Sequence, residues 1–131
     1  MRESSRTGAT LLVVDDNKVN RLLLTRSLEL QGHGVESAEN GRVALEMLRR
    51  GGFDLVLLDM EMPEMDGLEA TRRITARWKP KDRPRIVAMT ANAMQGDREE
   101  CLAAGMDDYL TKPIRVERLV EALNVARARE S

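Results

Sequence analysis

The sequence predicts an α/β protein in three layers, with a doubly wound parallel sheet between two layers of helices. Short apolar runs, at residues 11–14 and 55–58, have the composition of strands that are buried on both faces. They alternate with longer stretches in which apolar residues recur at helical spacing. Such alternation indicates successive βαβ units, and their right-handed crossovers place helices on either side of one sheet.

The first strand ends in two carboxylates and leads into the first helix. Residues 11–14 are Leu-Leu-Val-Val, and Asp15 and Asp16 follow directly. A helix that stops at Gly32 is then indicated by apolar residues near helical spacing: Val19, Leu22, Leu23 and Leu28. Residues 35–38 fit a short second strand.

The second helix lies between two turn signals. Asn40 and Gly41 open it, and Gly51 and Gly52 end it. Its apolar face consists of Val43, Ala44, Met47 and Leu48. The third strand, which is the second of the wholly apolar runs, again leads into a carboxylate, Asp59.

The second half of the chain repeats the alternation. A loop at 60–67 precedes a third helix, which has four residues on one side: Leu68, Thr71, Ile74 and Trp78. A strand at 85–90, a helix at 96–104 and a strand at 108–111 follow. Pro113 blocks further extension of that strand. The last helix has an apolar face formed by Val116, Leu119, Val120 and Leu123.

The elements add up to a (βα)5 arrangement in one domain. We expect one domain, because 131 residues suit a single core, and the two ends, at 1–8 and 127–131, look loose. The net charge of -1 gives no basic field for nucleic-acid binding. The one cysteine excludes an intramolecular disulfide and fits a reducing cytosol. With no apolar run near the ~20 residues of a membrane span, we expect a cytoplasmic protein.

Polar side chains follow four of the predicted strands: Asp15, Asp16, Asp59, Thr90 and Lys112. The carboxyl ends of parallel strands meet at one edge of the sheet, where ligands bind. Three carboxylates at that edge repel one another unless a cation lies among them. The candidates are the Lys112 ammonium and a divalent metal, and oxygen ligands favour Mg²⁺. A carboxylate facing both cations is suited to receive a phosphoryl group.

Each of these residues also has a plain structural interpretation when it is taken alone. Asp16 or Asn17 fits the N-cap of a helix, Thr90 fits a strand end, and Lys112 fits a surface charge. Their joint occurrence at matching strand ends favours the functional interpretation.

The sequence resembles the receiver domains of bacterial response regulators and hybrid histidine kinases, from about residue 9 to residue 126. The motifs that carry this resemblance are specific in combination: Val13-Val14-Asp15-Asp16-Asn17, Leu58-Asp59-Met60, Met62-Pro63, Met65-Asp66-Gly67, Met89-Thr90-Ala91 and Tyr109-Leu110-Thr111-Lys112-Pro113. The resemblance implies the flavodoxin-like strand order 2-1-3-4-5, for which the single-domain chemotaxis member of this family is a standard example.

The resemblance also implies a role for each residue at the strand ends. Asp59 would accept a phosphoryl group from a phosphohistidine, and Lys112 would contact the phosphoryl oxygens. Mg²⁺ would bind Asp16, Asp59 and the backbone carbonyl of Glu61, with Asp15 holding it through water. The peptide bond between Lys112 and Pro113 would be cis.

Two further residues would form a conformational switch. Thr90 would turn towards the phosphoryl group, and Tyr109 would then move inward. These shifts would reshape the surface of the fourth helix, fifth strand and fifth helix, where partners of this family bind. The side chains of Glu61 and Asn92 would flank the phosphoryl site and affect how easily water attacks it.

The residues around Asp15 and Thr90 resemble those of receivers in hybrid histidine kinases. The partners of such receivers are a sensor kinase and a histidine phosphotransfer domain. The chain stops soon after the last helix, without an output domain, so we expect either a stand-alone receiver or one cut from a larger protein. Such a domain is not an enzyme in the ordinary sense, because it catalyses only its own phosphorylation and dephosphorylation.

Three alternatives remain open on the sequence alone. A Mg²⁺-dependent phosphohydrolase would use the same Asp59 nucleophile, but 131 residues leave little room for a substrate cap. A flavin-binding electron carrier of the same fold would need a phosphate loop and aromatics, whereas Asp15 and Asp16 would repel a phosphate. A scaffold that binds partners without phosphorylation is disfavoured by the complete acidic site.

Overall fold

The computed structural model describes residues 10–62, 65–79, 82–91, 99–100, 102–112, 114–115, 117–119 and 121. Within these residues five strands form a single sheet in the order β2-β1-β3-β4-β5. The strands are β1 (Thr10–Val14), β2 (Gly34–Ala38), β3 (Leu55–Asp59), β4 (Arg85–Thr90) and β5 (Asp108–Thr111). All neighbouring strands are parallel. The predicted strand order is therefore confirmed.

Three helices are described over their full length: α1 (Lys18–Leu30), α2 (Gly41–Arg50) and α3 (Gly67–Arg77). Each begins at an Asn or Asp whose side chain accepts a hydrogen bond from a backbone N–H three residues on. Helical residues at 99–100, 102–103, 117–119 and 121 fall inside the two remaining predicted helices. No described helix is long and apolar enough to cross a membrane.

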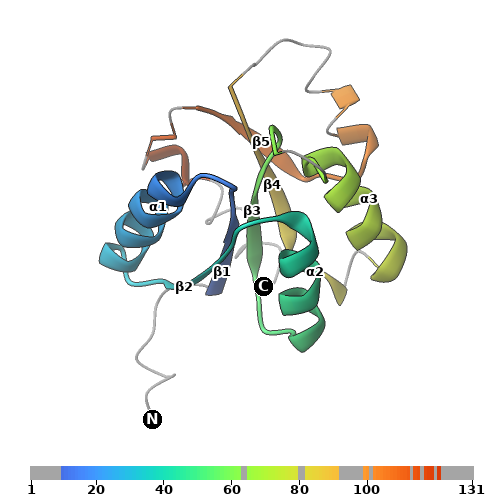
Figure 1. Cartoon of the computed structure of the whole chain (residues 1–131), viewed down its shortest axis with the longest axis horizontal. Helices are drawn as coiled ribbons and strands as arrows, with labels where there is room; N and C mark the ends of the chain where they lie inside the picture. The colour runs from blue at the N-terminus through green and yellow to red at the C-terminus, as the bar shows by residue number, and fades with distance from the viewer. Residues whose placement is uncertain are drawn as a thin grey trace.

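The helices cover the two faces of the sheet, as Figure 1 shows for α1 on one side and for α2 and α3 on the other. Strand side chains alternate between two buried clusters, because successive residues of a strand point to opposite faces. Leu12, Val56 and Ile86 pack with residues of α2 and α3. Leu11 and Leu55 pack instead with Leu28 of α1 and with other residues on that side. The three-layer prediction is confirmed.

The apolar residues of α1 do not share one face, which corrects the simplest interpretation of their spacing. Leu28 is 1% exposed, whereas Val19, Leu22 and Leu23 are each at least 60% exposed. Leu24, one turn before Leu28, is the residue that packs beside it against the sheet. Val19 lies roughly two and a half turns before Leu28 and therefore on the opposite side of the helix.

Several sequence predictions lie outside the described residues. They include the two ends at 1–8 and 127–131 and most of the fourth and fifth helices. The same holds for these individual residues: Pro63, Asn92, Cys101, Pro113, Val116, Val120 and Leu123.

Candidate functional site

The sheet gathers the predicted polar residues at its carboxyl edge. Asp15 follows β1, Asp59 and Thr90 are the last residues of β3 and β4, and Lys112 follows β5. In the strand register, Val14 lies opposite Leu58, and Thr90 lies opposite Thr111. Asp15 and Asp59 are therefore neighbours just beyond the last paired residues of β1 and β3. The three strand-end residues Asp15, Asp59 and Thr90 are 1%, 2% and 4% exposed.

Three carboxylates form an acidic group at this edge. One carboxylate oxygen from each of Asp15, Asp16 and Asp59 lies within 4.8 Å of the others. Asp15 and Asp59 are buried, whereas Asp16 is exposed to solvent. Three oxygen donors with no nitrogen or sulfur among them match the preferences of a hard divalent cation such as Mg²⁺.

The Asp15 carboxyl is in an environment that disfavours its charged form. Burial raises the pKa of Asp15, and the neighbouring negative charge of Asp59 raises it further. The backbone N–H of Asn17, which donates a hydrogen bond of 2.8 Å to Asp15 Oδ1, acts in the opposite direction. The positive charge of Lys112 also lowers this pKa, but burial and Asp59 outweigh it. A divalent ion between the carboxylates would relieve the remaining repulsion.

Lys112 supplies the positive charge on the other side of Asp59. Its Nζ lies 2.7 Å from Asp59 Oδ1, and the same oxygen accepts a hydrogen bond of 3.0 Å from the backbone N–H of Glu61. Burial alone would lower the pKa of Lys112, but its contacts with Asp59, Glu61 and Asp15 raise it. Lys112 is therefore a permanent cation at neutral pH.

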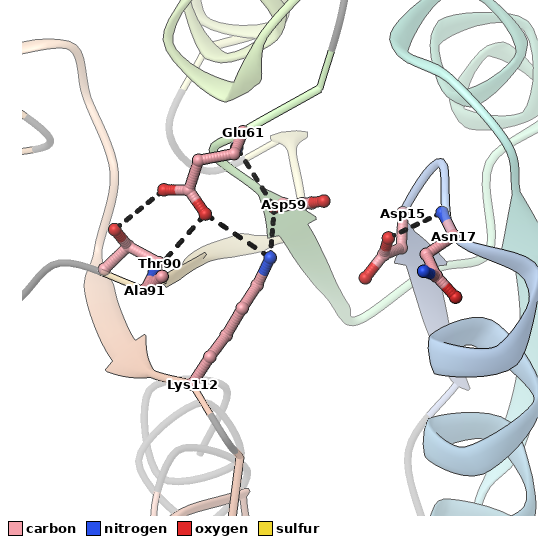
Figure 2. Close-up of polar contacts among 7 residues, drawn as sticks. All are labelled: Asp15, Asn17, Asp59, Glu61, Thr90, Ala91 and Lys112. Atoms are coloured by element: carbon pink, nitrogen blue, oxygen red, sulfur yellow. Dashed lines mark hydrogen bonds and ion pairs between the residues drawn. The ribbon is translucent and has the colours of Figure 1, made fainter.

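The Glu61 side chain extends across the site from β3 towards β4 and Lys112, as Figure 2 shows. Its carboxylate accepts hydrogen bonds from Thr90 Oγ1 at 3.0 Å and from the Ala91 backbone N–H at 3.3 Å. A third contact, of 3.4 Å, comes from Lys112 Nζ. The sequence places Glu61 beside the site, two residues after Asp59, but does not indicate these contacts.

Two supporting residues hold the backbone around the site. Arg21 of α1 donates a hydrogen bond of 2.6 Å to the Asp15 carbonyl, and nothing in the sequence pattern singles it out. Gly67 lies so close to β3 that an added Cβ would be 2.8 Å from the Asp59 carbonyl oxygen. Only glycine allows this approach, which explains its place in the Met65-Asp66-Gly67 motif.

Tyr109 lies within β5, three residues before Lys112. It is partly buried and packs against the cluster on the α2 and α3 side of the sheet. Its backbone N–H donates a hydrogen bond of 2.8 Å to Asp108 Oδ1. Its role as a switch stays a prediction. The same holds for the Glu61 carbonyl as a metal ligand. Asn92 and the cis bond before Pro113 lie outside the described residues.

The comparisons with known proteins identify the family. The family model described as the response regulator receiver domain matches residues 11–124, which is most of the chain. The chain belongs to the receiver domain family. Receivers of this family are found in two-component and phosphorelay systems, including hybrid histidine kinases.

The relatives of this receiver include hybrid kinases. It is 44% identical over 109 residues to the aerobic respiration control sensor protein ArcB of Escherichia coli, and the match covers 83% of this chain. It spans only about 14% of the length of that protein, and 13% to 15% of the other first curated relatives. The match therefore concerns one domain of much longer proteins.

Solved structures resemble this receiver over nearly their whole length. The receiver domain of sensor histidine kinase PA1611 from Pseudomonas aeruginosa, with a magnesium ion coordinated in its active site cleft, is 40% identical. The match has a TM-score of 0.80 and covers 91% of this chain and 97% of that one. The receiver of Saccharomyces cerevisiae Ssk1, crystallised with the histidine phosphotransfer protein Ypd1, is 28% identical with a TM-score of 0.80, covering 89% and 87%.

Proposed function

We propose that this receiver accepts a phosphoryl group on Asp59 from a phosphohistidine, and that the modification alters the binding of a partner. One observation carries this proposal. Asp59 is a buried carboxylate with an ammonium 2.7 Å from one oxygen and two further carboxylates close to it. This is a nucleophile placed between one resident cation and a site for a second, as phosphoryl transfer requires.

The oxygen donors at the site fit Mg²⁺. Asp16 and Asp59 would hold the ion through their side chains and Glu61 through its backbone carbonyl, while Asp15 would hold it through water. The magnesium in the PA1611 receiver supports this assignment. When bound, Mg²⁺ would neutralise charge on the phosphoryl oxygens.

The side chains of this receiver would then carry out the transfer. One oxygen of Asp59 forms a bond to phosphorus as the bond from phosphorus to the imidazole nitrogen breaks, and the electron pair of that bond stays on the imidazole. Lys112 is free to shift from Asp59 Oδ1 to the phosphoryl oxygens, because the carboxyl group of Asp59 loses its charge when it bonds to phosphorus, whereas those oxygens remain charged. The Thr90 hydroxyl, at the end of the neighbouring strand, donates a hydrogen bond to one of these oxygens.

The switch would follow from the same contacts. When Thr90 turns towards the phosphoryl group it leaves space into which Tyr109 moves, and the surface around β5 and its flanking helices changes. This surface would bind a downstream partner. The receiver would turn over no separate substrate, and its single cysteine fits a cytoplasmic location.

The phosphohistidine donor has a suitable docking surface on α1. Val19, Leu22 and Leu23 are 62%, 60% and 62% exposed and form an apolar face on this helix. Because α1 starts directly after Asp15 and Asp16, this face lies next to the acidic group. We assign it to the helix that bears the donor histidine, since that histidine must reach Asp59. The Ssk1 receiver, solved in complex with a phosphotransfer protein, supports a partner of this kind.

Replacing Leu22 and Leu23 together by Gln is expected to slow phosphotransfer about tenfold or more, because two apolar contacts with the donor are lost. The rate would be measured with a radiolabelled histidine phosphotransfer domain as donor. Uptake from acetyl phosphate, which needs no docking, should stay unchanged. Leu30→Gln is a matched control, since Leu30 is 80% exposed at the other end of α1.

Either of two outcomes would count against this account. If no donor labels the unaltered receiver, the proposed function is wrong. If labelling occurs and the double variant is as fast as the Leu30→Gln control, the donor docks elsewhere.

A further inference from the structure

The carboxylate of Glu61 occupies an anion-binding position formed by three different donors. A hydroxyl, a backbone N–H and an ammonium converge on it, from Thr90, Ala91 and Lys112, at 3.0, 3.3 and 3.4 Å. Figure 2 shows that these donors come from β4 and from the end of β5, and that Glu61 reaches them from the loop after β3. An acidic side chain from one strand end thus fills a cationic position formed by two others.

Two of these donors are those that the proposed function assigns to the phosphoryl group. Lys112 and Thr90 are expected to bind phosphoryl oxygens, and the Ala91 N–H lies beside them. A carboxylate and a phosphoryl group are both anionic acceptors, so they compete for the same donors. The Glu61 carboxylate and a phosphoryl group on Asp59 therefore cannot both make these contacts.

Glu61 is placed so that it can leave this position. Its backbone is held by the hydrogen bond from its own N–H to Asp59 Oδ1, of 3.0 Å. Its side chain is 48% exposed, so it can rotate into solvent without disturbing the core. Its ion pair with Lys112 is long, at 3.4 Å, and joins two partly exposed side chains, which makes it weak enough to be displaced.

We infer that Glu61 is an internal competitor of the phosphoryl group, an inference that rests on the proposed function. In the unmodified receiver its carboxylate holds Thr90, Ala91 and Lys112, and it is displaced when Asp59 is phosphorylated. The affinity of the site for a phosphoryl group is therefore set partly by this side chain. Glu61 is a positioning and competing residue and takes no part in bond formation.

The test measures the binding of beryllofluoride, an anion that mimics a phosphoryl group on a carboxylate, at saturating Mg²⁺. Glu61→Ala is expected to bind it roughly five- to tenfold more tightly than the unaltered chain, since the weak contacts of Glu61 no longer have to be broken. The affinity of Glu61→Gln for beryllofluoride should lie between those of the other two proteins, because its amide oxygen still accepts a hydrogen bond. Glu46→Ala, at an exposed position of α2, removes the same charge and should have no effect.

The order of the variants separates competition from simple charge repulsion, which would make Glu61→Gln equal to Glu61→Ala. A second readout needs no metal: the amide resonance of Ala91 should shift in both Glu61 variants and not in Glu46→Ala.

An affinity of Glu61→Ala for beryllofluoride that is unchanged or weaker would overturn the inference. If the unaltered chain does not bind beryllofluoride but Glu61→Ala does, the result supports competition by Glu61. If neither protein binds beryllofluoride, the inference about Glu61 and the proposed acceptor site are both wrong.

Discussion

A Lys112→Met receiver is expected to take up a phosphoryl group about 100- to 1000-fold more slowly than the unaltered chain. Lys112 is the one described side-chain cation within hydrogen-bonding distance of Asp59, at 2.7 Å, and its raised pKa keeps it charged. Its ammonium would stabilise negative charge on the phosphoryl oxygens during transfer. Methionine has a similar length but no charge, so the substitution removes this stabilisation.

The uptake rate would be measured with acetyl phosphate as donor at saturating Mg²⁺. Lys79→Met is a matched control, because Lys79 is exposed and lies away from the carboxyl edge of the sheet. A Lys112→Met rate within a few-fold of this control would show that Lys112 is only a structural partner of Asp59. Thermal melts would establish that both variants are folded.

Replacing Asp15 by Asn is expected to have opposite effects on stability and on metal binding. Mg²⁺ should bind about 10- to 100-fold more weakly, because a residue that holds the ion through water loses its charge. The metal-free protein should instead become more stable, by about 1 kcal/mol, because the substitution relieves repulsion at a functional site. The Asn side chain still offers an oxygen to the Asn17 N–H, so the turn after β1 is retained.

The gain in stability should depend on pH. Because burial and Asp59 raise the pKa of Asp15 in the folded state, this carboxyl favours folding while it is protonated. Its contribution is full below its ordinary pKa of 3.8 and is lost as the pH rises through the raised value. Asp15→Asn should therefore be the more stable protein at neutral pH, and the difference should shrink as the solution is acidified.

Thermal melts with and without Mg²⁺ would test both effects. The unaltered chain should gain stability when Mg²⁺ is added, and the variant should gain much less. A variant that is less stable than the unaltered chain at neutral pH without metal would contradict the proposed repulsion.

Much of the fold follows from the sequence because buried parallel strands leave a strong signal. The runs before Asp15 and Asp59 are entirely apolar, as both faces of the sheet are covered, and the polar residues after them must meet at one edge. The acidic group and the position of Lys112 follow from this rule of topology. They require no knowledge of side-chain directions.

Features that depend on side-chain direction were harder to predict. The spacing of apolar residues indicates α1, but it does not reveal that Leu22 and Leu23 face solvent while Leu24 and Leu28 face the sheet. Arg21 has no sequence signal, because its contact is with a backbone carbonyl. The position of the Glu61 carboxylate depends on a rotamer and on three donors from distant parts of the chain.

The central claim is best tested by the intact mass of the receiver after incubation with acetyl phosphate. One phosphoryl group should be added, in a reaction that requires Mg²⁺ and does not occur in an Asp59→Asn variant. A receiver that stays unmodified under conditions where a control receiver is phosphorylated would contradict the account, and so would an Asp59→Asn variant that is modified as fully as the unaltered chain.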